Sequence, residues 1–285
     1  MEDKNIFKKN FIWNLLGTSF NSFNSLFFLV IVTRINGLED AGIFTLGFAT
    51  ATILFIVGLY AGRVYQVTES DKKIANKDFI VNRIISCVLM IVFAILFVTI
   101  QNYDAYIVAI FLVLILYRCI EAFSDVFYGI LHKNELLHKV GKSLFVKSGL
   151  SIITFAIVNI ITQNLVLSCL FIVFSNLVVM IVYDIPNAKK LIDKNEKVNR
   201  DNVIEIFKKG FFAFAIAFLA LYLLNIPRYS IDSMLTQEMQ AIFGIIVMPA
   251  TVVALFGQFI LFPYLNKISE ICETKDLKKI RRMLL

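Results

Sequence analysis

Apolar blocks of about 18–25 residues recur along the whole chain, and each is long enough to cross a bilayer as a single helix. No other feature of the sequence restricts the fold as strongly. The composition agrees, since 59% of the residues are hydrophobic and only 17% are charged, whereas a soluble domain carries about 25% charged residues. The sequence therefore predicts an all-α polytopic membrane protein.

The blocks predict eight transmembrane helices. They cover residues 11–33, 41–61, 80–100, 105–127, 143–162, 164–183, 210–233 and 242–264. Lysine and arginine gather at alternate ends of these spans, in residues 4–9, 63–77, 133–147, 189–209 and 267–282. The other connections hold at most Arg34 and Arg228. Because short basic loops stay in the cytoplasm, both termini are predicted to be cytoplasmic. The net charge of +7 then reflects topology, and no nucleic-acid partner is expected.

A weak internal repeat relates the two ends of the chain. The motifs "KKNF" (8–11) and "KKGF" (208–211) open spans one and seven, and "FATATILF" (48–55) aligns with "PATVVALF" (249–256). An offset of about 200 residues indicates two copies of a six-span unit, and repeated transporters place their site between the copies. We therefore predict a six-helix lobe at residues 1–200. The first two helices of a second lobe, with a basic amphipathic tail, follow at 201–285.

Several stretches resemble a known family. They are "RINGLEDAGIF", "GLYAGRVYQVTE", "EAFSDVFYGIL" and "LNIPRYSIDSML" with the segment "AIFGIIVMPATVVALFGQFILFPYLNKIS". The chain resembles the Wzx-type polysaccharide flippases along essentially its whole length. That family lies in the superfamily shared with MATE exporters and lipid II flippases.

The resemblance implies an alternating-access transporter of the bacterial cytoplasmic membrane. Its implied substrate is a polyprenyl-pyrophosphate-linked oligosaccharide, flipped for surface polysaccharide biosynthesis, with polysaccharide assembly proteins as partners. Flippases of this type have two complete lobes. The chain is therefore expected to be a form truncated at its C-terminus.

Four polar residues recur on one face of span one. They lie at i, i+4, i+7 and i+11, as Asn14, Thr18, Asn21 and Ser25. Facing lipid, such side chains would lack hydrogen-bond partners. They therefore either bond to a neighbouring helix or line a water-filled cavity. Because a sugar needs many amide and hydroxyl partners, Asn14, Thr18 and Asn21 are candidate substrate contacts.

Span seven carries a helix breaker and two charges inside an apolar stretch, "LYLLNIPRYSIDSML" (221–235). Pro227 is expected to kink the helix, and Asn225, Arg228 and Asp232 share one face. An ionisable side chain at mid-bilayer costs about 3 kcal/mol, so each is a functional candidate. Arg228 either pairs with Asp232 at i, i+4 or faces a central cavity. In the cavity its planar donor group would grip a pyrophosphate, with Asn225 beside it as a further contact.

Span four places Arg118, Glu121 and Asp125 on one face, at i, i+3 and i+7. Arg118 and Glu121 either form an ion pair at the inner interface or line an inner vestibule, where Arg118 would contact substrate. Because a buried carboxylate can carry a proton, Glu121, Asp125 and Asp232 are candidates for ion coupling.

Arg63 lies at the inner end of span two. It is either a plain membrane anchor or a substrate contact at the cavity mouth, as the resemblance to lipid II flippases implies.

The sequence also bears on functions other than that of a flippase. An enzyme is not expected, because the outer loops are short and both histidines lie on a predicted cytoplasmic segment. The four cysteines have no metal-ligand spacing, so no metal or cofactor is predicted. A MATE-like exporter of drugs or cations would favour carboxylates in its cavity, whereas a pyrophosphate carrier would favour arginines, and the candidates divide equally. A further alternative is an inactive truncated form, or half of a split transporter that needs a partner chain.

Overall fold

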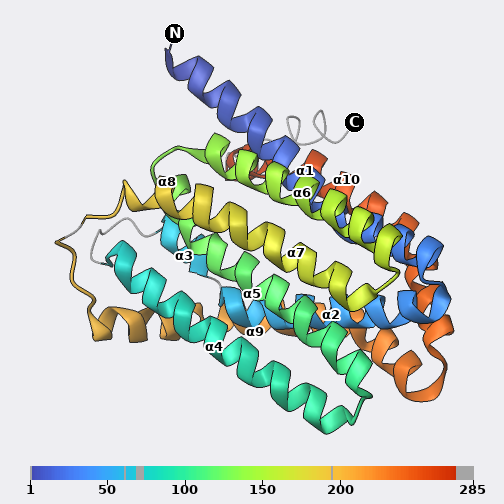
Figure 1. Ribbon diagram of the computed structural model, residues 1–285. Coiled ribbons are helices and arrows are strands. Elements are labelled where there is room, and N and C mark those ends of the chain that lie inside the picture. The colour runs from blue at the N-terminus through green and yellow to red at the C-terminus, as the bar shows by residue number, and fades with distance from the viewer. Residues whose placement is uncertain (1, 61, 69–73, 194, 274–285) are drawn as a thin grey trace. The chain divides into compact units, whose positions relative to one another are not determined.

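The computed structural model describes residues 2–60, 62–68, 74–193 and 195–273, and all regular structure within them is helical (Figure 1). In chain order the helices are α1 (Glu2–Ile35), α2 (Leu38–Leu59), α3 (Gly62–Thr68), α4 (Asn76–Gln101), α5 (Ala105–Lys133), α6 (Leu137–Thr162), α7 (Leu165–Val179), the π-helix η1 (Met180–Asp184), α8 (Ile185–Lys189), α9 (Arg200–Met234) and α10 (Gln237–Glu273).

Within these described ranges eight helices are long and apolar enough to cross a membrane, which confirms the predicted number of spans. The sixth is the continuous run of α7, η1 and α8. Several helices extend beyond the apolar blocks, because the polar residues at a membrane surface can continue the helix. Large apolar side chains such as Phe212 (75% exposed) and Leu224 (74% exposed) lie on the outside of α9, as in a helix that faces lipid.

The chain divides into two compact units, Met1–Gly244 and Ile245–Leu285. The first holds α1 to α9 and the beginning of α10, and α9 packs there against α2 and α4. The second holds the rest of α10, which is described as far as Glu273. The lobe boundary predicted after residue 200 rests on the internal repeat, and it stays a prediction.

Helix α5 is the centre of the first unit, where it contacts α2, α4, α6 and α7. Figure 1 shows it between α4 and α7. Its N-terminal half buries apolar side chains such as Phe111 and Leu114 completely. In its C-terminal half the charged side chains of Arg118, Glu121 and Asp125 are also largely buried.

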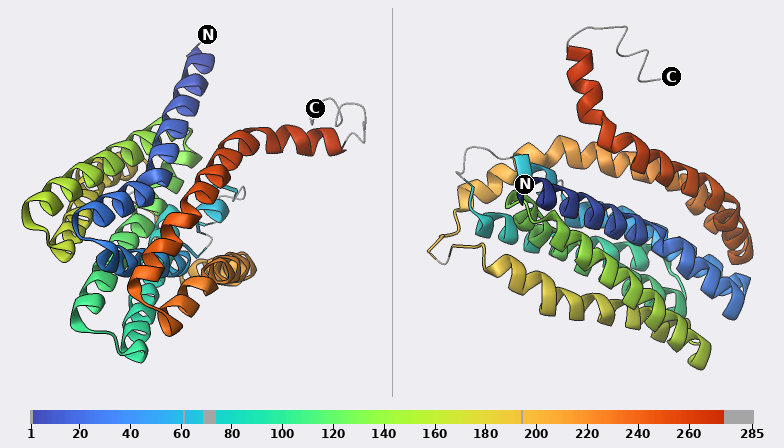
Figure 2. Two further views of the ribbon diagram at one scale, coloured as in Figure 1. Left: turned by 90° about the vertical axis from the view of Figure 1, so that its right-hand side faces the viewer. Right: turned by 90° about the horizontal axis from the view of Figure 1, so that it is seen from above.

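Helices α1 and α6 run side by side (Figure 2). Their backbones touch at Gly17 and Gly141. An added Cβ at Gly17 would overlap the carbonyl oxygen of Gly141, and one at Gly141 would overlap that of Trp13. Small residues allow membrane helices to approach this closely. The contact turns part of the polar face of span one toward α6.

The second span is interrupted at Tyr60, which adopts a left-handed backbone conformation (φ 42°) after the last turn of α2. Its ring stacks on Phe214 at 4.7 Å and meets Phe207 edge-on at 4.8 Å, between ring centroids. Both partners belong to α9. The chain resumes as α3, which carries Arg63 toward α5.

Candidate functional site

Asp125 of α5 binds two arginines that come from different helices. Its carboxylate oxygens lie 3.0 Å from Nη2 of Arg83 in α4 and 3.5 Å from Nη1 of Arg63 in α3. Nη1 of Arg83 also donates to the carbonyl oxygen of Gly58 at 2.8 Å. The carboxylate therefore joins three helices, and the cluster retains one excess positive charge.

The two arginines of this cluster differ in exposure. The side chain of Arg83 is 2% exposed, whereas that of Arg63 is 28% exposed. Arg63 and Asp125 were predicted in separate roles, and the structure brings them together. Arg83 is absent from the candidates derived from sequence, because its carboxylate partner lies on a different span.

Arg83→Ala is expected to destabilise the protein by about 3 kcal/mol, because it removes the buried partner of a carboxylate. Arg63→Ala is expected to cost less than about 1 kcal/mol, because a partly exposed ion pair contributes little and Arg83 still holds Asp125. Thermal unfolding of both variants in the same detergent measures the difference. Equal losses for the two variants would contradict the assignment of Arg83 as the main partner.

Arg118 forms the ion pair that its spacing predicts. Its Nη1 lies 2.6 Å from Oε2 of Glu121, and its Nη2 donates to the hydroxyl of Thr52 in α2 at 3.2 Å. The guanidinium carbon is 4.5 Å from the centroid of the Phe48 ring. The pair is thus turned toward α2. Its roles in substrate contact and ion coupling stay predictions.

The polar residues of span one differ in their hydrogen-bond partners. Asn21 accepts a hydrogen bond from Ser148 of α6 at 3.0 Å, so it connects two helices. The hydroxyl of Thr18 donates to the carbonyl oxygen of Asn14 at 2.6 Å, within its own helix. The Oδ1 atom of Asn14 is buried and has no hydrogen-bond partner. Of the three predicted contacts, Asn14 is therefore the one with a buried acceptor that lacks a partner.

Asn14 lines a pocket of about 670 Å³ beside the first turns of α1. The pocket is also lined by His132 and Lys133 at the end of α5, and by Glu135. Asn10 also lines the pocket, and its side-chain amide donates to the carbonyl oxygen of Glu135 at 2.7 Å. The pocket presents both charged and amide groups. Arg118 and Arg228 are not among its lining residues.

Arg228 carries a charge that no carboxylate neutralises within the described residues. The structure shows no ion pair between Arg228 and Asp232, so the pairing alternative from the i, i+4 spacing is wrong. The guanidinium carbon instead lies 5.3 Å from the centroid of the Phe243 ring. Its Nη1 atom is buried and has no hydrogen-bond partner. A buried donor of this kind is costly to leave unpaired, and it remains able to bind an acceptor.

The two other predicted residues of this stretch, Asp232 and Asn225, form hydrogen bonds with other groups. Asp232 accepts hydrogen bonds from Tyr103 and from the side-chain amide of Gln237, the latter at 2.9 Å. Burial raises the pKa of Tyr103, and the bond to Asp232 raises this pKa further, so Tyr103 stays a donor. Asn225 donates to the carbonyl oxygen of Leu221 at 2.8 Å, in its own helix.

Pro227 lies inside α9, and the helix continues past it as far as Met234. Next to Arg228, the hydroxyl of Tyr229 is 3.1 Å from that of Thr50 in α2.

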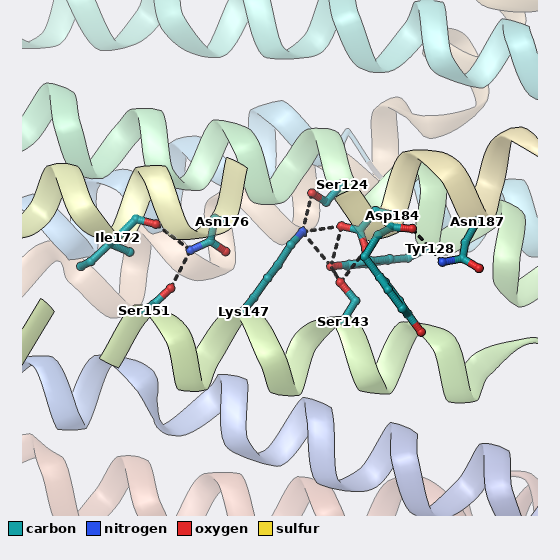
Figure 3. Close-up of polar contacts among 10 residues, drawn as sticks. Ser124, Tyr128, Ser143, Lys147, Ser151, Ile172, Asn176, Asp184 and Asn187 are labelled. Carbon is teal, nitrogen blue, oxygen red and sulfur yellow. Dashed lines mark hydrogen bonds and ion pairs between the residues drawn. The ribbon is translucent and has the colours of Figure 1, made fainter. Parts of the chain in front are cut away.

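A second buried ion pair lies between α5, α6 and η1 (Figure 3). Nζ of Lys147 is 2.6 Å from Oδ2 of Asp184, and the two side chains are 3% and 0% exposed. The ammonium group also donates to Ser124 at 2.7 Å and to Tyr128 at 3.0 Å. Lys147 was counted among the basic residues at the predicted cytoplasmic end of span five. The structure places its side chain inside the bundle and not at a surface, whereas the predicted side of the membrane stays a prediction.

The π-helix η1 brings Asp184 into this network. Pro186 follows two residues later and has no backbone N–H, so the regular helical bond at that turn cannot form. A wider turn is a common outcome, and π-turns often occur at functional positions. The sequence "YDIPN" (183–187) contains the proline signal. The predicted sixth span ended at residue 183, so Asp184 was counted outside the membrane.

A metal site is not evident in the part of the chain that the structure describes, where no three His, Cys, Asp or Glu residues lie close enough together to hold a metal ion.

Two known proteins are similar to the chain, one in sequence and one in structure. No protein-family model matches the chain. The capsular polysaccharide biosynthesis protein CapF of Staphylococcus aureus is 27% identical over 278 residues, which cover 95% of this chain and 68% of CapF. Among solved structures, that of a MATE protein in the bent conformation is similar with a TM-score of 0.47 and 16% identity. That match covers 73% of this chain and 52% of the MATE chain, so the present chain spans about half of its length.

Proposed function

We propose that the chain belongs to a membrane transporter that moves a lipid-linked oligosaccharide across the bacterial cytoplasmic membrane by alternating access, for surface polysaccharide biosynthesis. Its termini would lie in the cytoplasm, and polysaccharide assembly proteins would be its partners. The role is one of transport rather than of enzymatic catalysis. The similarity to CapF, a protein named for capsular polysaccharide biosynthesis, supports this proposal.

The observation that carries the proposal is the state of Arg228. It lies in α9, a helix long and apolar enough to cross a membrane, it has no carboxylate partner among the described residues, and one of its donors is buried and unpaired. A guanidinium group presents a planar set of donors that matches phosphate oxygens. A pyrophosphate linkage between lipid and sugar would supply both the negative charge and the acceptors that Arg228 lacks.

The distribution of charge also favours an anionic cargo over the cationic cargo of an exporter. Glu121 is neutralised by Arg118, and Asp125 is shared by two arginines. Asp232 is bonded to two neutral donors. The candidate carboxylates are thus already satisfied, whereas Arg228 is not.

Arg228→Ala is expected to reduce transport by at least about 30-fold, because truncating one partner of a buried charged contact costs about 2 kcal/mol or more. Transport is measured in proteoliposomes as the movement of a fluorescent polyprenyl-pyrophosphate oligosaccharide, with the variant placed in the complete transporter. Arg228→Lys is expected to retain part of the activity, because it keeps the charge but loses the two-point geometry.

Arg34→Ala is the matched control. Arg34 is also a predicted outer arginine, but it is exposed at the end of α1, so its removal is expected to leave transport unchanged. Correct membrane insertion of each variant is checked by its yield as a monodisperse protein in detergent. Wild-type transport by an inserted Arg228→Ala variant would overturn the proposed role of this arginine.

A further inference from the structure

The ammonium group of Lys147 is surrounded by oxygen atoms from two other elements. These are Oδ2 of Asp184 at 2.6 Å, Oγ of Ser124 at 2.7 Å and the hydroxyl of Tyr128 at 3.0 Å. An ammonium group has three donors, and each therefore has one oxygen. The lysine stem reaches from α6 to this position across the interior of the bundle (Figure 3).

The oxygens are themselves held in place by a second set of bonds. Ser143 donates to Oδ1 of Asp184 at 2.5 Å, and its hydroxyl is 2.9 Å from that of Tyr128. Ser143 thus holds the carboxylate oxygen that the ammonium group does not bind. All five side chains of the network are buried. The network is therefore a preformed, closed cluster of oxygen lone pairs that converge on one positive charge.

Such a cluster has the chemistry of a cation site. Carboxylate and hydroxyl oxygens are the ligands that hard metal cations prefer, and an ammonium group is close in size to K⁺. Lone pairs that accept hydrogen bonds from Nζ are the same lone pairs that would coordinate a metal ion. Nζ of Lys147 therefore occupies the position that a bound monovalent cation would take, and the lysine side chain attaches this charge to the chain.

We infer that the oxygen cluster around Asp184 is a monovalent-cation site whose occupant is built into the chain as the ammonium group of Lys147. In the native protein this site takes no cation from solution. A Na⁺ or K⁺ gradient cannot act through it, whatever the transported substrate is. Removal of the lysine side chain should convert it into a site for free K⁺ or Na⁺.

In Lys147→Ala, the unfolding temperature should depend on which cation is in solution. The purified full chain is unfolded thermally in KCl, NaCl or choline chloride at equal ionic strength. The variant is expected to be less stable than the wild type in choline, because Asp184 loses its partner. Saturating K⁺ should raise its unfolding temperature by about 5 °C, since a ligand that binds only the folded state stabilises it. Na⁺ should act more weakly, and choline is too large to enter.

Three controls separate this effect from a general salt effect. Wild-type protein and Lys139→Ala, a variant in the same helix but outside the network, should unfold at the same temperature in all three salts. Lys147→Met fills the space with an apolar side chain, so it should gain nothing from K⁺. A K⁺ response of similar size in any of these controls would overturn the inference.

The result remains decisive if Lys147→Ala is recovered poorly. Lys147→Ser adds one hydroxyl to the space that the lysine side chain leaves, and both variants are then solubilised in each salt. Recovery of folded protein in KCl but not in choline supports the cation site. An equal loss in all three salts, for both variants, would show that a free cation cannot replace the ammonium group and that the lysine is only an ion-pair partner.

Discussion

Replacing Asp184 by leucine is expected to lower the free energy of unfolding by about 3–5 kcal/mol, the usual cost of removing one partner of a buried ion pair. The ammonium group of Lys147, whose side chain is 3% exposed, would then be buried without its anion. Thermal unfolding in detergent, supported by denaturant titration, measures the loss. This is the largest single effect that we expect from a charged residue of the chain.

A double-mutant cycle tests the physical reason. Lys147→Met alone should also be strongly destabilising, whereas the combination Lys147→Met/Asp184→Leu should recover most of the loss, because it removes both buried charges together. The pair Glu205–Lys209 is the exposed counterpart, with side chains 45% and 54% exposed. Glu205→Ala should leave the unfolding temperature unchanged. Additive losses at residues 147 and 184 would mean that the two side chains do not act as a pair.

The membrane spans were predictable from the sequence, because each depends only on the length of a local apolar block. The eight predicted blocks correspond to eight helices of the structure. The positions at which the helices begin and end were less predictable. Helix α5 continues to Lys133 and α9 begins at Arg200, although the apolar blocks place these boundaries at 127 and 210.

The partners of the charged residues were predictable only where they lie on the same helix. The i, i+3 spacing correctly predicts the pair Arg118–Glu121. The same reasoning fails for Arg228 and Asp232. Asp232 instead accepts a hydrogen bond from Tyr103, which lies between α4 and α5. Spacing shows that two side chains share a face, but it does not show which neighbouring helix competes for them.

The buried network around Lys147 could be predicted neither from the length of the apolar blocks nor from the spacing of charges on one helix. A lysine close to the end of an apolar block is indistinguishable from a cytoplasmic anchor when only positive charges are counted. Its carboxylate partner lies 37 positions away in the chain, beyond a π-turn. Only the packing of α6 against α5 and η1 shows that the two charges meet inside the bundle.

Gly141→Ala is expected to destabilise the protein by about 3 kcal/mol, at the upper end of the cost of overpacking. The added Cβ would overlap the carbonyl oxygen of Trp13 in α1. Backbone atoms cannot move aside as a flexible side chain can, so the two helices must separate. For a protein of this size the loss corresponds to a fall of about 6–10 °C in the unfolding temperature. Gly17→Ala should act in the same way, because its Cβ would overlap the carbonyl oxygen of Gly141.

Gly149→Ala is the matched control, since it makes the same change in the same helix and faces α1 as well. Its Cβ would lie 3.5 Å from Cε1 of Phe20, an ordinary contact distance, and alanine favours a helix over glycine. The control variant should therefore be as stable as the wild type or slightly more stable. Separation of α1 from α6 should also weaken the bond between Asn21 and Ser148. If Gly141→Ala and Gly149→Ala unfold at the same temperature, the two helices do not depend on backbone contact, and the orientation of the polar face of span one must be set elsewhere.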